Sequence, residues 1–433
     1  MSSSEWREVK LGDLLEVSSS KRIYAKEYVE SGVPFYRSKE IIEKSKGNDV
    51  STELFISEER YNEIKNKFDV PNYGDILLTS VGTLGIPYIV KNEKFYFKDG
   101  NLTWLKNFGN DSNNLFLYYW ILSPYGVNQI NSKCIGSTQK ALTIDTLKKF
   151  DLNLPPLPEQ KAIAHILSTL DDKIEVNNQI NKTLENIAQT IFKQWFVDFE
   201  FPNGAGEPYK SSGGEMVESE LGMIPKGWEV TKLDEICNFI SGYSYKGNEL
   251  VASNNAMITI KNFDRNGGFK LDGYKEISIS DRVKDKHFVS IFDILVAHTD
   301  LTQNAEIIGN PILVTNTMSY KKIIFSMDTV KVDPIIENYR FYIYGLLLDS
   351  NFKGYALGNM NGTTVLHLSK KALPDYKFVK ASNDLIERYN YLVKPLYEKI
   401  INIYSENIAL NKLRDSLLPK LMSGEIRVPI EEN

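Results

Sequence analysis

The chain contains the same sequence pattern twice. Trp6–Leu11 reads WREVKL, and Trp228–Leu233 reads WEVTKL, 222 residues further on. Asp75–Leu77 recurs as Asp293–Leu295 at an offset of 218. A long internal repeat decides the architecture, because each copy must fold as its own unit. We therefore expect two related units of about 220 residues each, which agrees with several domains for 433 residues.

The second half of each copy keeps a constant register. From Gly136 and Gly362 onward the offset stays at 226. Seven positions in each copy carry this match, mostly with apolar residues: Ile163, Leu170, Ile174, Asn181, Leu184, Ile187 and Ile191 correspond to Tyr389, Leu396, Ile400, Asn407, Leu410, Leu413 and Leu417.

Within each copy, the pattern changes from mixed to helical. The first 150 residues combine a predicted helix near 115–130 with strand-like runs at Val33–Tyr36, Asp75–Leu78, Ile86–Val90 and Phe95–Phe97. After Leu154–Gln160 (LPPLPEQ), apolar residues take helical spacing with no Gly or Pro until Pro202. This pattern predicts an α+β globule followed by a helix of about 40 residues, roughly 60 Å long.

Each predicted helix has one apolar stripe that needs a partner, so we expect the two helices to pack together as an antiparallel coiled coil. The residues expected in this seam are Ile163, Leu170, Ile174, Asn181, Leu184, Ile191, Leu396, Ile400, Asn407, Leu410 and Leu417. Asn181 and Asn407 either fix the register from buried positions or face solvent at the stripe's edge. Pro395 should bend or delay the second helix.

The net charge of −5 is unevenly distributed. Residues 1–150 carry 20 basic and 19 acidic side chains, and residues 225–380 carry 19 and 17. Residues 151–224 carry 5 basic and 12 acidic side chains, and residues 381–433 carry 7 and 8. The two globules are thus close to neutral, which weakens the charge argument against nucleic acid without making one for it.

Familiar catalytic signatures are missing from the sequence. It has no P-loop, no strand-borne GxGxxG, and no Asn/Asp-Pro-Pro-aromatic tetrapeptide. Two cysteines and four scattered histidines give no disulfide framework or metal-ligand spacing. Asp171–Asp172 and His165 are more typical of a helix surface than of a metal site. We expect no covalent chemistry from this chain, and no bound metal or cofactor.

The longest apolar stretches, Leu115–Leu122 and Phe341–Leu348, are shorter than the roughly 18 residues of a membrane helix. The start MSSSEWREVK has no apolar signal region. We therefore expect a cytoplasmic protein without membrane contact.

Several motifs together resemble the specificity (S) subunits of type I restriction-modification systems. They are Leu154–Gln160, Gly222–Trp228 (GMIPKGW) and Leu413–Ile426 (LRDSLLPKLMSGEI), with support from Gly74–Leu77 and Gly362–Thr364. The resemblance covers essentially the whole chain.

The resemblance implies an α+β fold in which two repeated α/β target recognition domains are joined by two long helices, packed as an antiparallel coiled coil with pseudo-twofold symmetry. The expected boundaries are 1–154 for the first domain, 155–200 for the first spacer helix and 201–224 for a linker. They continue with 225–380 for the second domain, 381–424 for the second helix and 425–433 for a tail.

The resemblance also implies the partners. Such a subunit reads an asymmetric bipartite site in double-stranded DNA, assembles with two modification (adenine methyltransferase) subunits, and recruits restriction (translocase and nuclease) subunits. S-adenosylmethionine, ATP and Mg would then serve the partner subunits.

Polar residues on loops are the candidates for DNA contact, because base edges are read by Arg, Lys, Asn, Gln and small hydroxyl side chains. In the first globule these are Lys21, Arg22, Tyr24, Arg37, Ser38, Lys39, Ser80, Thr83, Gln139 and Lys140. In the second they are Tyr243, Tyr245, Lys246, Lys261, Asn262, His298, Thr299, Asn361 and Thr363. The same loops carry different residues, as two different half-sites would require.

Three alternatives remain open from the sequence. The chain could be a coiled-coil scaffold whose two heads bind proteins or ligands, or a specificity subunit of a modification-only system. A self-contained methyltransferase or nuclease is disfavoured because the sequence has no motif for S-adenosylmethionine or metal.

Overall fold

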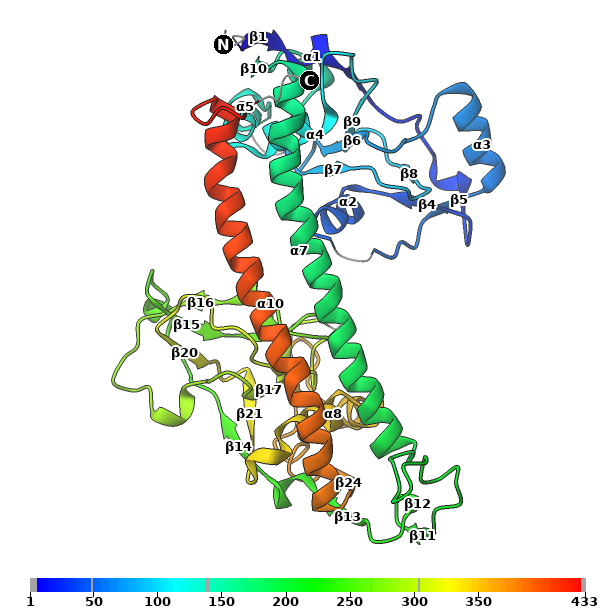
Figure 1. The fold of residues 1–433 in the computed structure, drawn as a ribbon, viewed down its shortest axis with the longest axis vertical. Helices are drawn as coiled ribbons and strands as arrows, with labels where there is room; N and C mark the ends of the chain where they lie inside the picture. Colours follow the sequence, from blue (N-terminus) through cyan, green and yellow to red (C-terminus); the bar gives the residue numbers. More distant parts are fainter. Residues whose placement is uncertain (1–5, 48–49, 137–139, 266, 303, 430–433) are drawn as a thin grey trace. The chain divides into compact units, whose positions relative to one another are not determined.

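Each of the two units in the structure combines one α/β head with part of two long helices, α7 and α10 (Figure 1). The computed structural model describes residues 6–47, 50–136, 140–265, 267–302 and 304–429. Unit 1 comprises Met1–Val176 and Ala409–Asn433, and unit 2 comprises Asn177–Ile408. We call residues 7–154 the first head and residues 229–380 the second head.

The first head is built on two small sheets. The larger sheet is antiparallel and has the order β2-β9-β6-β7, formed by Glu16–Ser18, Leu102–Lys106, Ile76–Thr79 and Pro87–Ile89. The other has the order β3-β5-β4-β8, formed by Tyr28–Val29, Phe55–Ile56, Val33–Tyr36 and Tyr96–Phe97, and β4 pairs with β8 in parallel. The strand β1 (Arg7–Lys10) pairs with β10 (Asp151–Leu154), so both ends of the head meet.

The described residues of the first head also form these α-helices: α1 (Leu11–Leu14), α2 (Ser38–Ser45), α3 (Glu58–Lys67), α4 (Asn114–Leu122), α5 (Pro124–Lys133) and α6 (Ile144–Lys148). The sequence predicted one helix near 115–130, but the structure has two, because the chain breaks at Ser123. The Ser123 hydroxyl accepts a hydrogen bond from the Gly126 amide, and Pro124 occupies the first helical position, where its missing N–H costs nothing.

The second head repeats this topology. Its larger sheet has the order β14-β21-β17-β19, formed by Cys237–Ser241, Thr329–Pro334, Ile294–Ala297 and Pro311–Leu313. A three-stranded sheet has the order β16-β15-β20, formed by Lys275–Glu276, Asn255–Ile258 and Lys322–Phe325, with β15 parallel to β20 as β4 is to β8. The strand β13 (Glu229–Lys232) pairs with β24 (Lys377–Lys380). The repeat found in the sequence is thus a repeat of strand order and of pairing.

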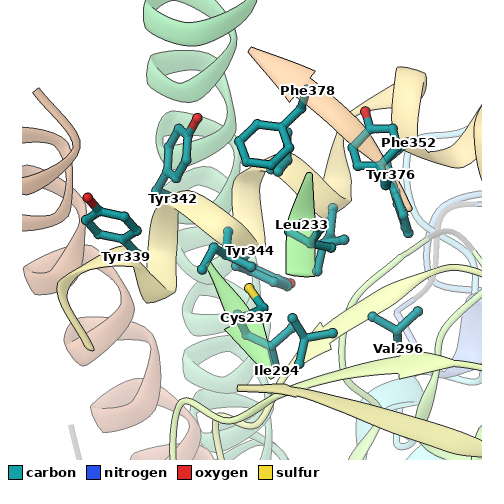
Figure 2. Close-up of a cluster of buried hydrophobic side chains, with 14 of the residues drawn as sticks. Leu233, Cys237, Ile294, Val296, Tyr339, Tyr342, Tyr344, Phe352, Tyr376 and Phe378 are labelled. Carbon is teal, nitrogen blue, oxygen red and sulfur yellow. The ribbon is translucent and has the colours of Figure 1, made fainter. Parts of the chain in front are cut away.

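Two helices of the second head, α8 (Arg340–Leu348) and α9 (Ser350–Gly358), contribute to the main core of unit 2. Every residue of α8 from Arg340 to Leu347 is buried, which explains why its apolar residues show no single stripe. Figure 2 shows part of this core, including Cys237, Ile294 and Tyr344. Burial raises the pKa of the Cys237 thiol, so this cysteine is an inert core residue.

The long helices pack antiparallel within each unit. α7 spans Leu157–Phe192 and continues as a short π-helix to Val197, and α10 spans Asn383–Ser423. In unit 1, Ile163 and Leu167 near the start of α7 share a core with Leu418 and Leu421 near the end of α10. In unit 2 the relation is reversed, because the end of α7 packs with the start of α10.

The residues predicted for the seam differ in burial. Four are buried (Ile163, Asn181, Ile400 and Asn407), and seven are half-buried (Leu170, Ile174, Leu184, Ile191, Leu396, Leu410 and Leu417). The expectation for Pro395 was wrong on one point, because α10 already begins at Asn383 and is not delayed. Pro395 has no N–H to donate to the carbonyl of Tyr391, one turn earlier in α10. Both residues are exposed, so this carbonyl can accept a hydrogen bond from water instead.

The segment predicted as a linker is folded. Within residues 201–224, β11 (Met216–Ser219) and β12 (Gly222–Pro225) form an antiparallel hairpin, which ends one residue later than the predicted segment. Phe201 stacks between Tyr209 and Trp228, with ring centroids 4.5 and 5.1 Å apart. This aromatic stack ties the segment to the core of unit 2.

Candidate nucleic-acid interface

A turn between β8 and β9 organises the loops of the first head. The amide of Lys98 donates to the carbonyl of Tyr36 (2.9 Å), at the end of β4. The carbonyl of Asn101 accepts from the amide of Ser80 (2.9 Å) and from the hydroxyl of Ser38 (3.3 Å). We call residues 98–101 the first central turn. It brings together loops that lie far apart in the sequence.

The loop before β3 also meets the first central turn. The Arg22 guanidinium pairs with the Asp99 carboxylate at 2.7 Å, and the amide of Lys21 donates to the hydroxyl of Tyr96 (2.7 Å). Lys21, Arg22 and Tyr24 are all exposed. Their loop is therefore held by a backbone hydrogen bond, by the Arg22–Asp99 ion pair and by the buried side chain of Ile23.

The sequence predicted Arg37, Ser38 and Lys39 on a loop, but Arg37 is the N-cap of α2, and Ser38 and Lys39 form its first turn. An acidic partner fixes this helix start. The Arg37 guanidinium lies 2.6 Å from the Glu40 carboxylate, which is 4% exposed. Burial alone would raise the pKa of Glu40, but the hydrogen bonds from Arg37 outweigh it and lower that pKa. Arg37 is thus committed to an ion pair, whereas Lys39 beside it is exposed.

The loop after β6 pairs with the segment before α6. The amide of Leu142 donates to the carbonyl of Ser80 (2.9 Å), and Ala141 forms antiparallel bridges with Val81 and Ile135. Thr83 and Lys140 are exposed here, and Ser80 is buried. Gln139 lies outside the described residues.

The second head has an equivalent turn at Ser326–Asp328, which we call the second central turn. The amide of Ser326 donates to the carbonyl of Ile258 (2.9 Å), and the amide of His298 donates to the carbonyl of Asp328 (2.8 Å). The amide of Leu368 donates to the carbonyl of His298 (2.9 Å). These three bonds match those made by Lys98, Ser80 and Leu142, so both heads share one hydrogen-bonded frame.

The second central turn brings several predicted residues together. Tyr243 bridges to Ser326, and His298 and Thr299 follow strand β17, with Thr299 in β18 (Thr299–Asp300). β18 pairs with β23 (Leu366–Leu368), which pairs with β22 (Met360–Asn361), so Asn361 joins the same group. Lys246, Lys261, Asn361 and Thr363 are exposed, and Tyr245 is half-buried.

Three predicted residues of the second head have mainly structural surroundings. Asn262 is fully buried, and its side chain bonds to the amide of Thr259 and the carbonyl of Lys270. Tyr243 is 3% exposed, and its hydroxyl donates to Glu249 and accepts from Arg282. Thr299 is 5% exposed. All three side chains are thus too buried for extensive contact with a ligand outside the head.

Sequence reasoning missed both central turns and the residue His367. The turns carry no motif of their own, because their role depends on backbone groups. His367 takes the bridging position that Ala141 takes in the first head, 226 residues earlier, and that position is known only from the strand pairing.

His298 lies near two other basic groups of the second head, His367 and Lys370. Burial lowers the pKa of His298, and the nearby His367 and Lys370 lower it further. His298 is therefore neutral near pH 7, with one donor and one acceptor nitrogen. The hydroxyl of Thr299 lies 3.4 Å from Nδ1 of His367.

Other kinds of site find little support in the part of the chain that is described. No group of His, Cys, Asp or Glu residues there could hold a metal ion. None of the helices searched is long and apolar enough to cross a membrane. Asp171 on α7, which the sequence placed on a helix surface, accepts from the hydroxyl of Tyr119 and pairs with Arg414, both at 2.7 Å.

In chemical terms, each head is a hydrogen-bonded frame that presents varied side chains. Backbone hydrogen bonds position the loops, so exposed side chains can change without altering the frame. Such an arrangement suits the reading of base edges, in which donors, acceptors and methyl groups must be matched at fixed positions.

Comparison with known proteins gives a consistent family. Residues 3–186 match the family model described as type I restriction modification DNA specificity domain. The chain is 27% identical over 429 residues to the type I restriction enzyme MjaIX specificity subunit of Methanocaldococcus jannaschii, covering 98% of this chain and 94% of the relative. It is 25% identical over 344 residues to the HindI specificity subunit of Haemophilus influenzae, covering 67% and 72%.

A solved structure supports the fold. The S subunit of a type I restriction-modification system from M. genitalium aligns with a TM-score of 0.56 at 15% sequence identity. The alignment covers 98% of this chain and 97% of that chain. The similarity extends over both heads and both long helices.

Proposed function

Because this chain belongs to the specificity subunits of type I restriction-modification systems, we propose that it reads an asymmetric bipartite DNA site, with one head on each half-site. The observation that carries this proposal is the frame shared by the two heads, in which equivalent hydrogen bonds support unlike side chains. Two copies of one reading device with different contact residues select two different sequences.

The subunit itself is a non-catalytic part of the system, and its role is to position others. Two adenine methyltransferase subunits would bind it, use S-adenosylmethionine, and each act on an adenine in one half-site. Methylation requires the target base to leave the helical stack, so the subunit must place each methyltransferase beside its adenine. Restriction subunits, with ATP and Mg, would join the same complex.

The charge distribution predicts a dependence on these partners. Each head is close to electrical neutrality by sequence, and DNA affinity at physiological salt rises with the number of phosphates neutralised. We therefore expect weak DNA binding by the isolated chain and tight binding by its complex with the modification subunits. Tight, sequence-specific binding by the chain alone would contradict this.

The test is methylation by a reconstituted complex. The chain is co-expressed with the modification subunits of its own system, and modified bases in the host DNA are mapped by single-molecule sequencing. The matched control omits this chain. We expect methylated adenines in one bipartite motif only when the chain is present.

Two outcomes would redirect the proposal. Purification of the chain without a methyltransferase subunit, and no methylated motif, would favour a scaffold with two protein- or ligand-binding heads. Methylation without cleavage of unmodified DNA, even with every subunit of the system present, would indicate a modification-only system.

A further inference from the structure

Three residues at the edge of each head occupy strictly equivalent positions. In the first head, Ala141 bridges to Val81 on one side and to Ile135 on the other. In the second head, His367 pairs with Thr299 on one side and with Asn361 on the other. We call these two sets the first and second edge trios.

The backbone of each trio is anchored in the same way. The residue after the middle member, Leu142 or Leu368, donates its amide to the carbonyl of Ser80 or His298 at 2.9 Å. Those residues in turn donate to the central turns, at Asn101 or Asp328. Any difference between the trios therefore lies in their side chains.

The side chains differ in chemical class. The first trio (Val81, Ile135 and Ala141) is apolar throughout, and Ile135 is 55% exposed. The second trio (Thr299, Asn361 and His367) is polar throughout. Thr299 is buried beside His367, so Asn361 and His367, which are both exposed, are the members that can meet a ligand. Ile135 is therefore an apolar side chain that a ligand can contact at the edge of the first head, at the position where the second head has Asn361.

Base edges in the major groove offer matching partners. An apolar side chain contacts the C5-methyl group, which only thymine presents. A donor reaches the N7 acceptor that both purines present, and an Asn amide bonds to N6 and N7 of adenine together. The carboxamide of Asn361 and the imidazole of His367 can supply such donors.

We propose that the edge trios are specificity determinants, with the first trio selecting thymine in one half-site and the second trio selecting a purine in the other. This inference rests on the proposed function, since it assigns bases to the two heads. It also identifies positions at which the half-sites can be exchanged without rebuilding the frame.

Transplanting the second trio into the first head tests the assignment. The variant Val81→Thr/Ile135→Asn/Ala141→His is assembled with the modification subunits and offered a plasmid library with both half-sites randomised. Methylated positions are then read by single-molecule sequencing. The second half-site in the same molecules is the internal control.

The expected result is a change of preference at one position of the first half-site, from thymine to a purine, by roughly tenfold or more. The second half-site should stay the same. Methylation at the wild-type level with an unchanged first half-site would overturn the inference. A wild-type complex that methylates no bipartite motif would instead overturn the proposed function itself.

A variant that removes one exposed side chain guards against misfolding. His367→Ala should leave thermal unfolding and complex assembly unchanged, and should weaken the purine preference in the second half-site alone. Retention of the full purine preference by an assembled His367→Ala/Asn361→Ala complex would likewise refute the assignment.

Discussion

Asn181 lies buried in the helix seam of unit 2 without a partner, and removing its amide should stabilise the protein. Its side chain is 3% exposed, and neither amide atom has a hydrogen-bond partner among the described residues. The neighbouring Asn407 is satisfied, because its Oδ1 accepts from Asn177 (2.8 Å) and its Nδ2 donates to Asn178 (2.9 Å).

The internal repeat explains the difference. The antiparallel register places residue 177 opposite 407, so it also places 181 opposite 403. The 226-residue offset carries Asn177 onto Ile403 and Asn181 onto Asn407. Asn407 therefore faces an asparagine, whereas Asn181 faces an isoleucine in the symmetric position.

The magnitude follows from the cost of a buried unsatisfied amide, which is about 1–3 kcal/mol. Asn181→Leu should raise the free energy of unfolding by about that amount, and the melting temperature of unit 2 by roughly 2–12 °C. The matched control, Asn407→Leu, should destabilise by about 1 kcal/mol, since it removes the hydrogen bonds of Asn407 with the buried Asn177 and with Asn178, while Asn177 still donates to Glu406.

Thermal and urea unfolding of the full chain, followed by circular dichroism, measures both variants. A double-mutant cycle adds Ile403→Asn, which should cost less in the wild type than in the Asn181→Leu background. Destabilisation by Asn181→Leu as large as that by Asn407→Leu would refute the reasoning.

Three further predictions concern single positions. Gly126→Ala should destabilise the first head strongly, because the added Cβ would lie 2.4 Å from the Trp120 carbonyl oxygen. The control Gly354→Ala in α9 adds a Cβ in open space and should stabilise the protein by about 0.5–1 kcal/mol. Unfolding curves of the two variants test this difference. Glu159→Ala should cost about 2–3 kcal/mol in unit 1, since this buried carboxylate accepts from Trp6 and Arg427, and equal stability with the wild type would contradict it. Burial and nearby positive charge lower the pKa of His298 and His287 in the folded protein. The unfolded chain therefore binds protons at higher pH than the folded chain, and the free energy of unfolding should fall as the pH drops from 7 to 5. His298→Asn should make this dependence on pH shallower.

Much of the fold could be predicted from the sequence because it depends on repeated patterns. The 226-residue offset and the apolar stripes predicted two heads and two packed helices, and Ile163, Leu167 and Ile400 lie in the cores as such stripes require. The break at Ser123 and the continuity of α10 through Pro395 depend on local capping and on which face meets solvent. The apolar pattern alone does not contain that information.

The candidate interface was harder to predict, because it depends on backbone hydrogen bonds between distant segments. Residue type pointed to polar loops, but Asn262 and Tyr243 use their polar atoms inside the head. The central turns and His367 have no local signal. They become visible only when the equivalent bonds of the two heads are compared.

The central claim is that each head reads one half-site independently on a common frame. The most direct measurement replaces residues 229–380 with the corresponding segment of the M. jannaschii relative, and maps the adenines that the reconstituted complex methylates. The account predicts a hybrid motif, in which the half-site read by residues 7–154 is unchanged and the other half-site is new. A motif changed in both halves, or in neither, would contradict it.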